Sequence, residues 1–417
     1  MNLHEEMLII GQNAVEASRK MTQLASRKKN VILMSMAEEL EISRAQLIEA
    51  NDKDMQEGYN VGLNSALLDR LKLTDARIDG MIKGLQAVAS LGDPIGTQIS
   101  SWLRPNGLEI VKERVPIGVI GIIYESRPNV TADTTALCLK TANAVILRGG
   151  KEAFYSNMAI AKALQAGGAK KGMPKNAVQL IATTDRAAVK ELVQLIGLVD
   201  VVIPRGGETL IKAVTEMAYV PVIKHYKGVC HTYVDASADL QMAKDIIINA
   251  KCQRPGVCNA MESLLIHKDL VETFVPEIVK ELIEQDVKVK GDARVKSVCP
   301  QVEDATEEDW YAEYLDLVLS VKIVDDVQDA IDHINKYGSK HSDAIISSDK
   351  KSQGLFVRDV DSATVYINAS TRFTDGGEFG MGAEIGISTD KLHARGPMGL
   401  DELTTYKYII YGSGQIR

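Results

Sequence analysis

Residues 118–153, GVIGIIYESRPNVTADTTALCLKTANAVILRGGKEA, decide the fold of this chain. Two short apolar runs, GVIGIIY and AVILRGG, lie on either side of TADTTALCLKTAN, a stretch with the length and spacing of a helix. Short apolar strands that alternate with helices are typical of a parallel sheet with helices on both faces. The stretch therefore predicts a β-α-β unit of an α/β domain.

The same alternation continues to about residue 227, where the polar stretch HYKG interrupts it, and a second α/β series starts near Val229. Residues 1–95 carry apolar positions at helical spacing instead. Two stretches, NGLEIVKERVP at 106–116 and TTYKYIIYGSGQIR from residue 404, alternate like strands but fit neither series. We expect them to pair outside the main sheets.

Composition narrows the class of protein. A chain of 417 residues exceeds what one hydrophobic core normally serves, and 45% hydrophobic with 25% charged residues is typical of a soluble globular protein. A net charge of −8 gives no general attraction to nucleic acid or anionic membranes. Five cysteines without a C-x-x-C pair suit reduced thiols in the cytoplasm, and no metal-ligand spacing or membrane span is present. We expect a cytoplasmic protein with no metal, nucleic-acid partner or membrane contact.

Two loops at strand ends are candidate phosphate sites. The chain has neither G-x-G-x-x-G after its first strand nor a Walker A motif. ILRGGKEA (146–153) and VIPRGGETL (202–210) each place Arg-Gly-Gly between a strand and a helix, where backbone N–H groups and a guanidinium can hold an anion. A glycine-assisted turn with a solvated arginine explains one such loop equally well. Two in succession favour a phosphorylated ligand.

The segment RPGVCNA (254–260) places Cys258 directly after a Pro-Gly turn. By residue type alone, a cysteine is more often a small buried hydrophobic residue than a nucleophile. A cysteine on a turn between regular elements invites a chemical explanation.

Three segments, KERVPIGVIGIIYESRPNVTADTTALCLKTANAVILRGGKEA, VIPRGGETLI and QRPGVCNAMESLLIH, closely resemble the gamma-glutamyl phosphate reductases of the aldehyde dehydrogenase superfamily. The resemblance implies an aldehyde dehydrogenase-like α/β fold, with two α/β domains of open, mainly parallel sheets and a small strand extension for oligomerisation. It assigns 1–98, 119–226 and about 370–395 to a dinucleotide-binding domain, and 227–369 to a catalytic domain. The strands at 99–118 and 396–417 would bridge the subunits of a homodimer or larger oligomer.

The resemblance also implies an activity. It is the NADPH-dependent reduction of L-glutamyl 5-phosphate to L-glutamate 5-semialdehyde, with release of phosphate, through a cysteine thioester in L-proline biosynthesis. Cys258 would be the nucleophile, and Asn129 with the backbone N–H of Cys258 would stabilise the oxyanion. Without the resemblance, Asn129 would be interpreted as the N-cap of the helix that follows it.

The remaining site residues follow from the same resemblance. The residues expected at the cofactor are Arg148 and Lys151 at the extra phosphate of NADP, Arg205, Gly206 and Gly207 at the pyrophosphate, and Glu313 at the nicotinamide ribose. Arg127, Arg254 and Arg372 are candidates for the substrate's phosphate or carboxylate. No metal is expected.

Two alternatives stay open. One is a CoA-acylating or hydrolytic aldehyde dehydrogenase with the same thiol, although the stretch VIKHYKGV lacks the carboxylate that hydrolytic relatives use as a base. The other is a catalytically silent dinucleotide-binding protein. The sequence shows no amino-acid-kinase domain, so we expect another protein to supply the acyl phosphate. Glutamate 5-kinase is the candidate partner, and transient contact with it would channel the labile intermediate.

Overall fold

The computed structural model describes residues 2–224 and 227–417, and the chain divides into two compact units. Unit 1 is Met1–Lys224, Gly380–Gly386 and Met398–Arg417, and unit 2 is His225–Phe379 and Ile387–Pro397. The division after Lys224 lies near the expected break at residue 227. Of the segment 370–395 expected in the first domain, only Gly380–Gly386 belongs to unit 1, whereas residues 370–379 and 387–395 belong to unit 2. Thr371 and Thr374 tie the first of these stretches to unit 2 by hydrogen bonds to Asn259.

Unit 1 begins with helices, as the spacing of apolar residues in 1–95 predicts. Three of these helices have a side-chain N-cap: Asn2, Asn64 and Thr74 each accept a hydrogen bond from a backbone N–H of the first turn. The helices are α1 (Leu3–Met21), α2 (Ser26–Ile42), α3 (Arg44–Asn60), α4 (Ser65–Leu71) and α5 (Asp75–Ser90).

A four-stranded parallel sheet forms the centre of unit 1, in the order β5-β4-β3-β6. Every residue of β3 is buried, which explains why GVIGIIY reads as a continuous apolar run. Its strands are β3 (Val119–Tyr124), β4 (Ala144–Gly149), β5 (Val178–Leu180) and β6 (Val201–Arg205), and its helices are α6 (Asn129–Lys140), η1 (Lys151–Ala153), α7 (Phe154–Lys170), α8 (Ala187–Val193) and α9 (Glu208–Met217). Parallel strands have their carboxyl ends at one edge, so the loops after β3, β4 and β6 share that edge.

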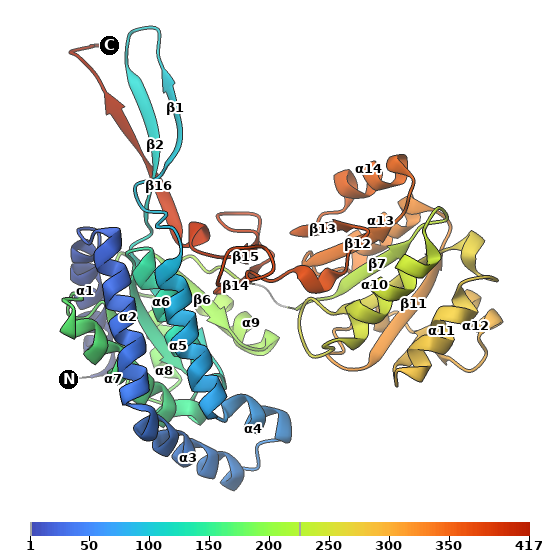
Figure 1. Ribbon diagram of the computed structural model, residues 1–417, viewed down its shortest axis with the longest axis horizontal. Coiled ribbons are helices and arrows are strands. Elements are labelled where there is room, and N and C mark those ends of the chain that lie inside the picture. The colour runs from blue at the N-terminus through green and yellow to red at the C-terminus, as the bar shows by residue number, and fades with distance from the viewer. Residues whose placement is uncertain (1, 225–226) are drawn as a thin grey trace. The chain divides into compact units, whose positions relative to one another are not determined.

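The two stray stretches pair with each other. They form a separate antiparallel sheet of β1 (Gln98–Leu103), β2 (Glu109–Pro116) and β16 (Thr404–Tyr411), in the order β1-β2-β16. This ribbon extends away from the sheet and helices of unit 1 (Figure 1). The expectation that these strands lie outside the main sheets is confirmed.

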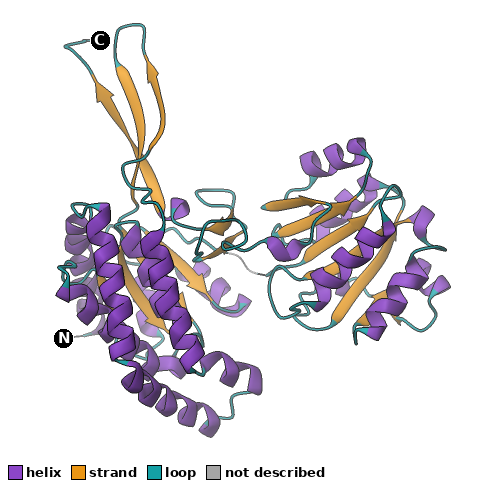
Figure 2. Cartoon of the chain, in the orientation of Figure 1, coloured by secondary structure: helices purple, strands orange, loops and turns teal. Residues whose placement is uncertain are grey.

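Unit 2 has a seven-stranded parallel sheet, ordered β10-β9-β11-β8-β7-β12-β13, with helices on both faces (Figure 2). Its strands are β7 (Cys230–Val234), β8 (Met261–His267), β9 (Lys288–Gly291), β10 (Glu303–Asp304), β11 (Val318–Val324), β12 (Ser342–Ile346) and β13 (Thr364–Ile367). Its helices are α10 (Leu240–Cys252), η2 (Lys268–Leu270), α11 (Val275–Glu284), α12 (Ala293–Val298), η3 (Asp309–Tyr311), α13 (Val327–Tyr337), α14 (Lys350–Asp359) and η4 (Thr371–Phe373).

Successive side chains of a strand point to opposite faces of a sheet, and unit 2 uses both faces. On β8, Leu264 and Ile266 join the core formed with α10 and α11, whereas Leu265 joins the core formed with α13 and α14. A two-stranded sheet of β14 (Gly386–Ser388) and β15 (Gly396–Met398), followed by η5 (Asp401–Leu403), lies where the chain passes between the units. Among the described residues, no helix combines the length and apolar character needed to cross a bilayer.

Candidate active site

Cys258 lies on the turn between α10 and β8 and is half-buried. Its carbonyl oxygen accepts a hydrogen bond from Cys230 Sγ at 3.2 Å. A Cβ atom on Gly228 would lie 1.8 Å from the same oxygen, so only glycine fits there. Gly228 and Cys230 therefore hold the backbone of the turn that carries the Cys258 thiol.

Gly228 also connects this turn to Glu313. Its backbone N–H donates to Glu313 Oε1 at 2.6 Å. Gly228, Cys258 and Glu313 precede β7, β8 and β11, which are neighbours in the parallel sheet. The candidate residues of unit 2 therefore gather at the amino ends of these strands, although ligands of open α/β sheets usually bind at the carboxyl ends.

A buried ion pair supports the Glu313 loop. Lys251 Nζ lies 2.5 Å from Glu262 Oε2, and neither side chain is exposed to solvent. Glu262 Oε1 accepts from the backbone N–H of Leu315, two residues after Glu313, and Leu315 has a positive φ of 54°. Burial raises the pKa of Glu262 to about 7, and the Lys251 ammonium opposes the rise.

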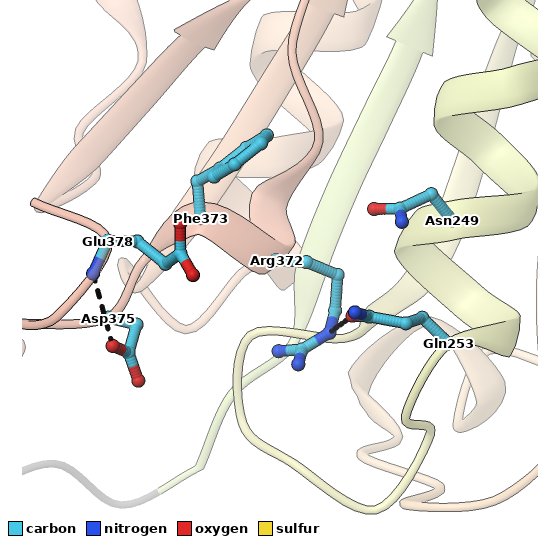
Figure 3. A pocket seen from close by; sticks show the side chains of 6 residues that line it. All are labelled: Asn249, Gln253, Arg372, Phe373, Asp375 and Glu378. Carbon is cyan, nitrogen blue, oxygen red and sulfur yellow. Dashed lines mark hydrogen bonds between the residues drawn. The ribbon is translucent and has the colours of Figure 1, made fainter.

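Two amide side chains hold Arg372 close to the turn that carries Cys258. Its Nε donates to Gln253 Oε1 at 3.0 Å, and one terminal nitrogen donates to Asn259 Oδ1 (Figure 3 shows Arg372 and Gln253). Asn259 is buried directly after Cys258 and donates to the carbonyl of Thr374 at 2.8 Å. Burial lowers the pKa of Arg372, and the positive charge of the exposed Arg254 lowers it further.

In unit 1, Asn129 opens α6 at the carboxyl end of β3. The N-cap of α6 is Pro128, so the interpretation of Asn129 as a helix cap is wrong. Asn129 is already inside the helix, and its Nδ2 donates to Asp133 one turn later at 2.8 Å. Burial raises the pKa of Asp133 to about 6, while the Asn129 hydrogen bond and the charge of Arg205 lower it.

Each glycine-rich loop involves a side-chain carboxylate: Glu125 contacts the loop at 202–210, and Glu152 belongs to the loop at 146–153. Glu125 Oε2 accepts from the Gly207 N–H at 2.9 Å, at the N-terminus of α9, and a Cβ on Gly206 would lie 2.4 Å from the same oxygen. Glu152 accepts from the N–H and the hydroxyl of Ser126, whose φ is +35°. The Gly207 N–H therefore already bonds a negative charge.

The other predicted arginine and lysine sites differ in exposure. Arg148 is 7% exposed and donates to the carbonyls of Gly149, Thr184 and Asp185. Lys151 and Arg127 are exposed, and Arg205 is half-buried, with its guanidinium against Gly386. Arg148 therefore uses most of its N–H donors to bond backbone carbonyls of the neighbouring loops. The sequence pattern did not indicate this structural role.

The other four cysteines have thiols with raised pKa values. Cys138, Cys230 and Cys299 are buried, Cys252 is half-buried, and burial raises the pKa of all four thiols. Within residues 2–224 and 227–417, no group of three His, Cys, Asp or Glu side chains is arranged to hold a metal ion. His225 and Tyr226, part of the stretch without a catalytic carboxylate, lie outside the described residues.

Each unit thus assembles part of the predicted site. Unit 2 brings Cys258 together with Glu313 through Gly228 and with Arg372 through Asn259. Unit 1 places Asn129, Arg148 and Arg205 at the carboxyl ends of adjacent strands. The supporting residues Gly228, Asn259, Asp133 and Glu125 were not predicted from the sequence. Only Asp133 carried a signal, since it follows Asn129 at the i, i+4 spacing of a helix.

Comparison with known proteins identifies the family. The model of the aldehyde dehydrogenase family matches residues 4–316. A gamma-glutamyl phosphate reductase of Caldanaerobacter subterraneus is 56% identical over 412 residues, which cover 99% of this chain and 100% of the relative. One of Moorella thermoacetica is 54% identical over 417 residues, the whole of both chains. The crystal structure of the Thermotoga maritima gamma-glutamyl phosphate reductase superposes with a TM-score of 0.97 at 47% identity, over 99% of this chain and 100% of that one. By sequence and by fold, the chain belongs to the gamma-glutamyl phosphate reductases of the aldehyde dehydrogenase family.

Proposed function

We propose that this oxidoreductase reduces L-glutamyl 5-phosphate to L-glutamate 5-semialdehyde and releases phosphate, as its relatives' name indicates. The observation that carries the proposal is the placement of Cys258. Cys258 is half-buried on a turn whose backbone is held by Cys230 and Gly228. Arg372, whose guanidinium is held by Gln253, lies beside this turn. Cys230, Cys252, Cys138 and Cys299 are less suited to attack because burial raises the pKa of each thiol.

The chemistry begins with the Cys258 sulfur. Its thiolate attacks the acyl carbon, the carbonyl π pair moves onto oxygen, and collapse of this oxyanion expels phosphate and leaves a thioester. Asn129 and the Cys258 N–H would donate to the oxyanion. Donors of this kind act where charge develops, so their orientation matters more than their number. Asp133 accepts from Asn129 Nδ2 and holds that amide in one orientation.

The residues present fit a nicotinamide dinucleotide. The Gly207 N–H at the N-terminus of α9 already bonds a carboxylate, so it is competent to bind a phosphate oxygen. Arg205, Gly206 and Gly207 would hold the pyrophosphate, Glu313 the nicotinamide ribose, and Arg148 with Lys151 the extra phosphate of NADP. When bound, NADPH supplies the hydride that reduces the thioester to the aldehyde. No carboxylate base that activates water is needed for this reaction.

We further propose a homo-oligomer in the cytoplasm that receives its substrate from glutamate 5-kinase by transient contact. The ribbon supports the oligomer, because its strands expose large apolar side chains: Trp102, Leu103, Tyr406, Tyr408, Ile410 and Tyr411 are 40–72% exposed. Strands 99–118 and 396–417 would supply this contact, unit 1 would bind the dinucleotide, and unit 2 would carry the nucleophile.

The test is a phosphate-dependent assay in the reverse direction. Purified protein is mixed with glutamate 5-semialdehyde and NADP, with and without phosphate, and NADPH formation is followed. We expect turnover only with phosphate, and none from Cys258→Ala, which should still bind NADPH. Turnover that ignores phosphate indicates a hydrolytic enzyme, and turnover that requires CoA indicates an acylating one. Retained activity in Cys258→Ala, or absence of turnover under all conditions, would refute the proposal.

A further inference from the structure

A pocket of unit 2 lies beside the nucleophile turn. It is lined by Asn249, Gln253, Arg372, Phe373, Asp375 and Glu378 (Figure 3). The first two residues come from α10 and the turn after it, and the other four come from η4 and the loop that follows. The pocket therefore combines one fixed cation with two carboxylates, two amides and an aromatic ring.

Arg372 is prepared to bind an anion. Gln253 and Asn259 engage its Nε and one terminal nitrogen, which fixes the plane of the guanidinium. Among the described residues, no hydrogen bond uses its other terminal nitrogen, so two N–H donors remain. Asn259, which holds this guanidinium, directly follows Cys258. A carboxylate bound to Arg372 would thus lie near the reacting sulfur, and a guanidinium and a carboxylate match in geometry.

The opposite side of the pocket is acidic. Asp375 shapes its own loop, because its Oδ1 accepts from the backbone N–H of Gly377 at 2.8 Å and of Glu378 at 3.3 Å. This turn presents Glu378, whose exposed carboxylate accepts no side-chain hydrogen bond in the part of the chain that the structure describes. Two carboxylates repel a phosphate group, so the pocket disfavours the phosphorylated end of the proposed substrate. An ammonium group, in contrast, suits Glu378.

We propose that this pocket binds the α-amino-carboxylate end of the substrate, with Arg372 on the α-carboxylate and Glu378 on the α-ammonium. The inference rests on the proposed function, since it names the side chains that select an amino acid substrate. Phe373 is 49% exposed and offers a ring for the methylene groups between the two ends. Asn259 acts as a positioning residue, because it directly follows Cys258 and its side-chain oxygen accepts from Arg372.

The test compares two aldehydes that differ only in the amino group, glutamate 5-semialdehyde and 5-oxopentanoate. The rate constant kcat/KM is measured for each with NADP and phosphate. The wild type should prefer the amino-bearing aldehyde by about tenfold or more, because a site built to bond a polar group rejects the analogue that lacks it. Glu378→Gln should reduce this preference by about tenfold, and Arg372→Gln should raise KM for both aldehydes.

Glu272→Gln is the matched control, since Glu272 is an exposed glutamate of the same unit outside the pocket. It should keep the wild-type preference. Alkylation of Cys258 by iodoacetamide in every variant shows that the turn is intact. A wild type that turns over both aldehydes equally well, or a Glu378→Gln variant that keeps the full preference, overturns the inference and leaves the proposed function standing. Absence of phosphate-dependent turnover of either aldehyde overturns the proposed function, and the inference with it.

Discussion

Replacement of Asp133 by asparagine should make unit 1 more stable at high pH. Burial raises the pKa of Asp133 from 3.8 to about 6, so the folded state favours the protonated carboxyl. Such a group contributes stability that is complete below the unfolded pKa and is lost as the pH rises through the folded pKa. Asparagine has no proton to lose, and its amide oxygen can still accept from Asn129.

The size of the effect follows from the shift. Two pKa units correspond to about 3 kcal/mol in total, and the part lost between pH 5 and pH 8 is about 1.4 kcal/mol. Because Asp133 is only partly screened from solvent, we expect the wild type to lose about 1 kcal/mol more than Asp133→Asn over this range.

The assay is urea unfolding of both proteins at pH 5, 6, 7 and 8. The urea concentrations at half unfolding can be compared only if the unfolding free energy of both proteins depends on urea with the same slope. Asp52→Asn, a change at an exposed aspartate of α3, is the control and should follow the wild type at every pH. If the unfolding free energies of the wild type and Asp133→Asn change with pH in parallel, ionisation of Asp133 does not destabilise the folded state and the reasoning is refuted. A companion variant, Asp133→Leu, removes the acceptor of Asn129 and should lower kcat, because Asn129, the oxyanion donor that we propose, is then free to rotate.

Three further predictions concern other parts of the chain. Glu125→Gln should tighten NADPH binding by about 1 kcal/mol, because a phosphate would no longer compete with a carboxylate for the Gly207 N–H. Fluorescence titration measures this affinity, and weaker binding would show that Glu125 assists the cofactor. Arg148→Ala should weaken NADPH more than NADH, and should also cost about 1–3 kcal/mol of stability in urea unfolding, because the carbonyls that Arg148 bonds lose their partner. Unchanged stability would contradict that supporting role. Replacing Tyr408 and Ile410 by serine should yield monomers in light scattering, since both side chains are more than half exposed on β16; an unchanged mass would place the subunit contact elsewhere.

Much of the architecture was predictable because periodicity reports burial. The run VIGIIY is buried along its whole length as β3, and the alternating stretches at 106–116 and from residue 404 became β2 and β16. Strand β9, with sequence KVKG, gave no such signal, because lysine occupies half of its positions. Its place in the sheet is set by pairing with β11, which a local pattern cannot report.

Candidate site residues could be proposed from the sequence where a residue type suggests chemistry, but the contacts that support them depend on the tertiary structure. The Pro-Gly turn marked Cys258, but nothing local shows that Gly228 must lack a side chain so that the Cys258 carbonyl can approach. Similarly, Asn129 precedes a helical run and suggests a cap. Pro128 takes that position instead, and the Asn129 amide is turned along the helix towards Asp133. Long-range partners such as Arg372 and Asn259 are separated by most of unit 2 in sequence.

The ribbon pairs strands that are synthesised at very different times during translation. Strands β1 and β2 are complete once Pro116 has been synthesised, whereas β16 starts only at Thr404. During the interval the free edge of β2, with its unpaired N–H and C=O groups, resembles the exposed edges through which strands of separate chains associate. Nascent chains on one messenger would therefore be prone to premature pairing at this hairpin, and the three-stranded ribbon is complete only after β16 has been translated.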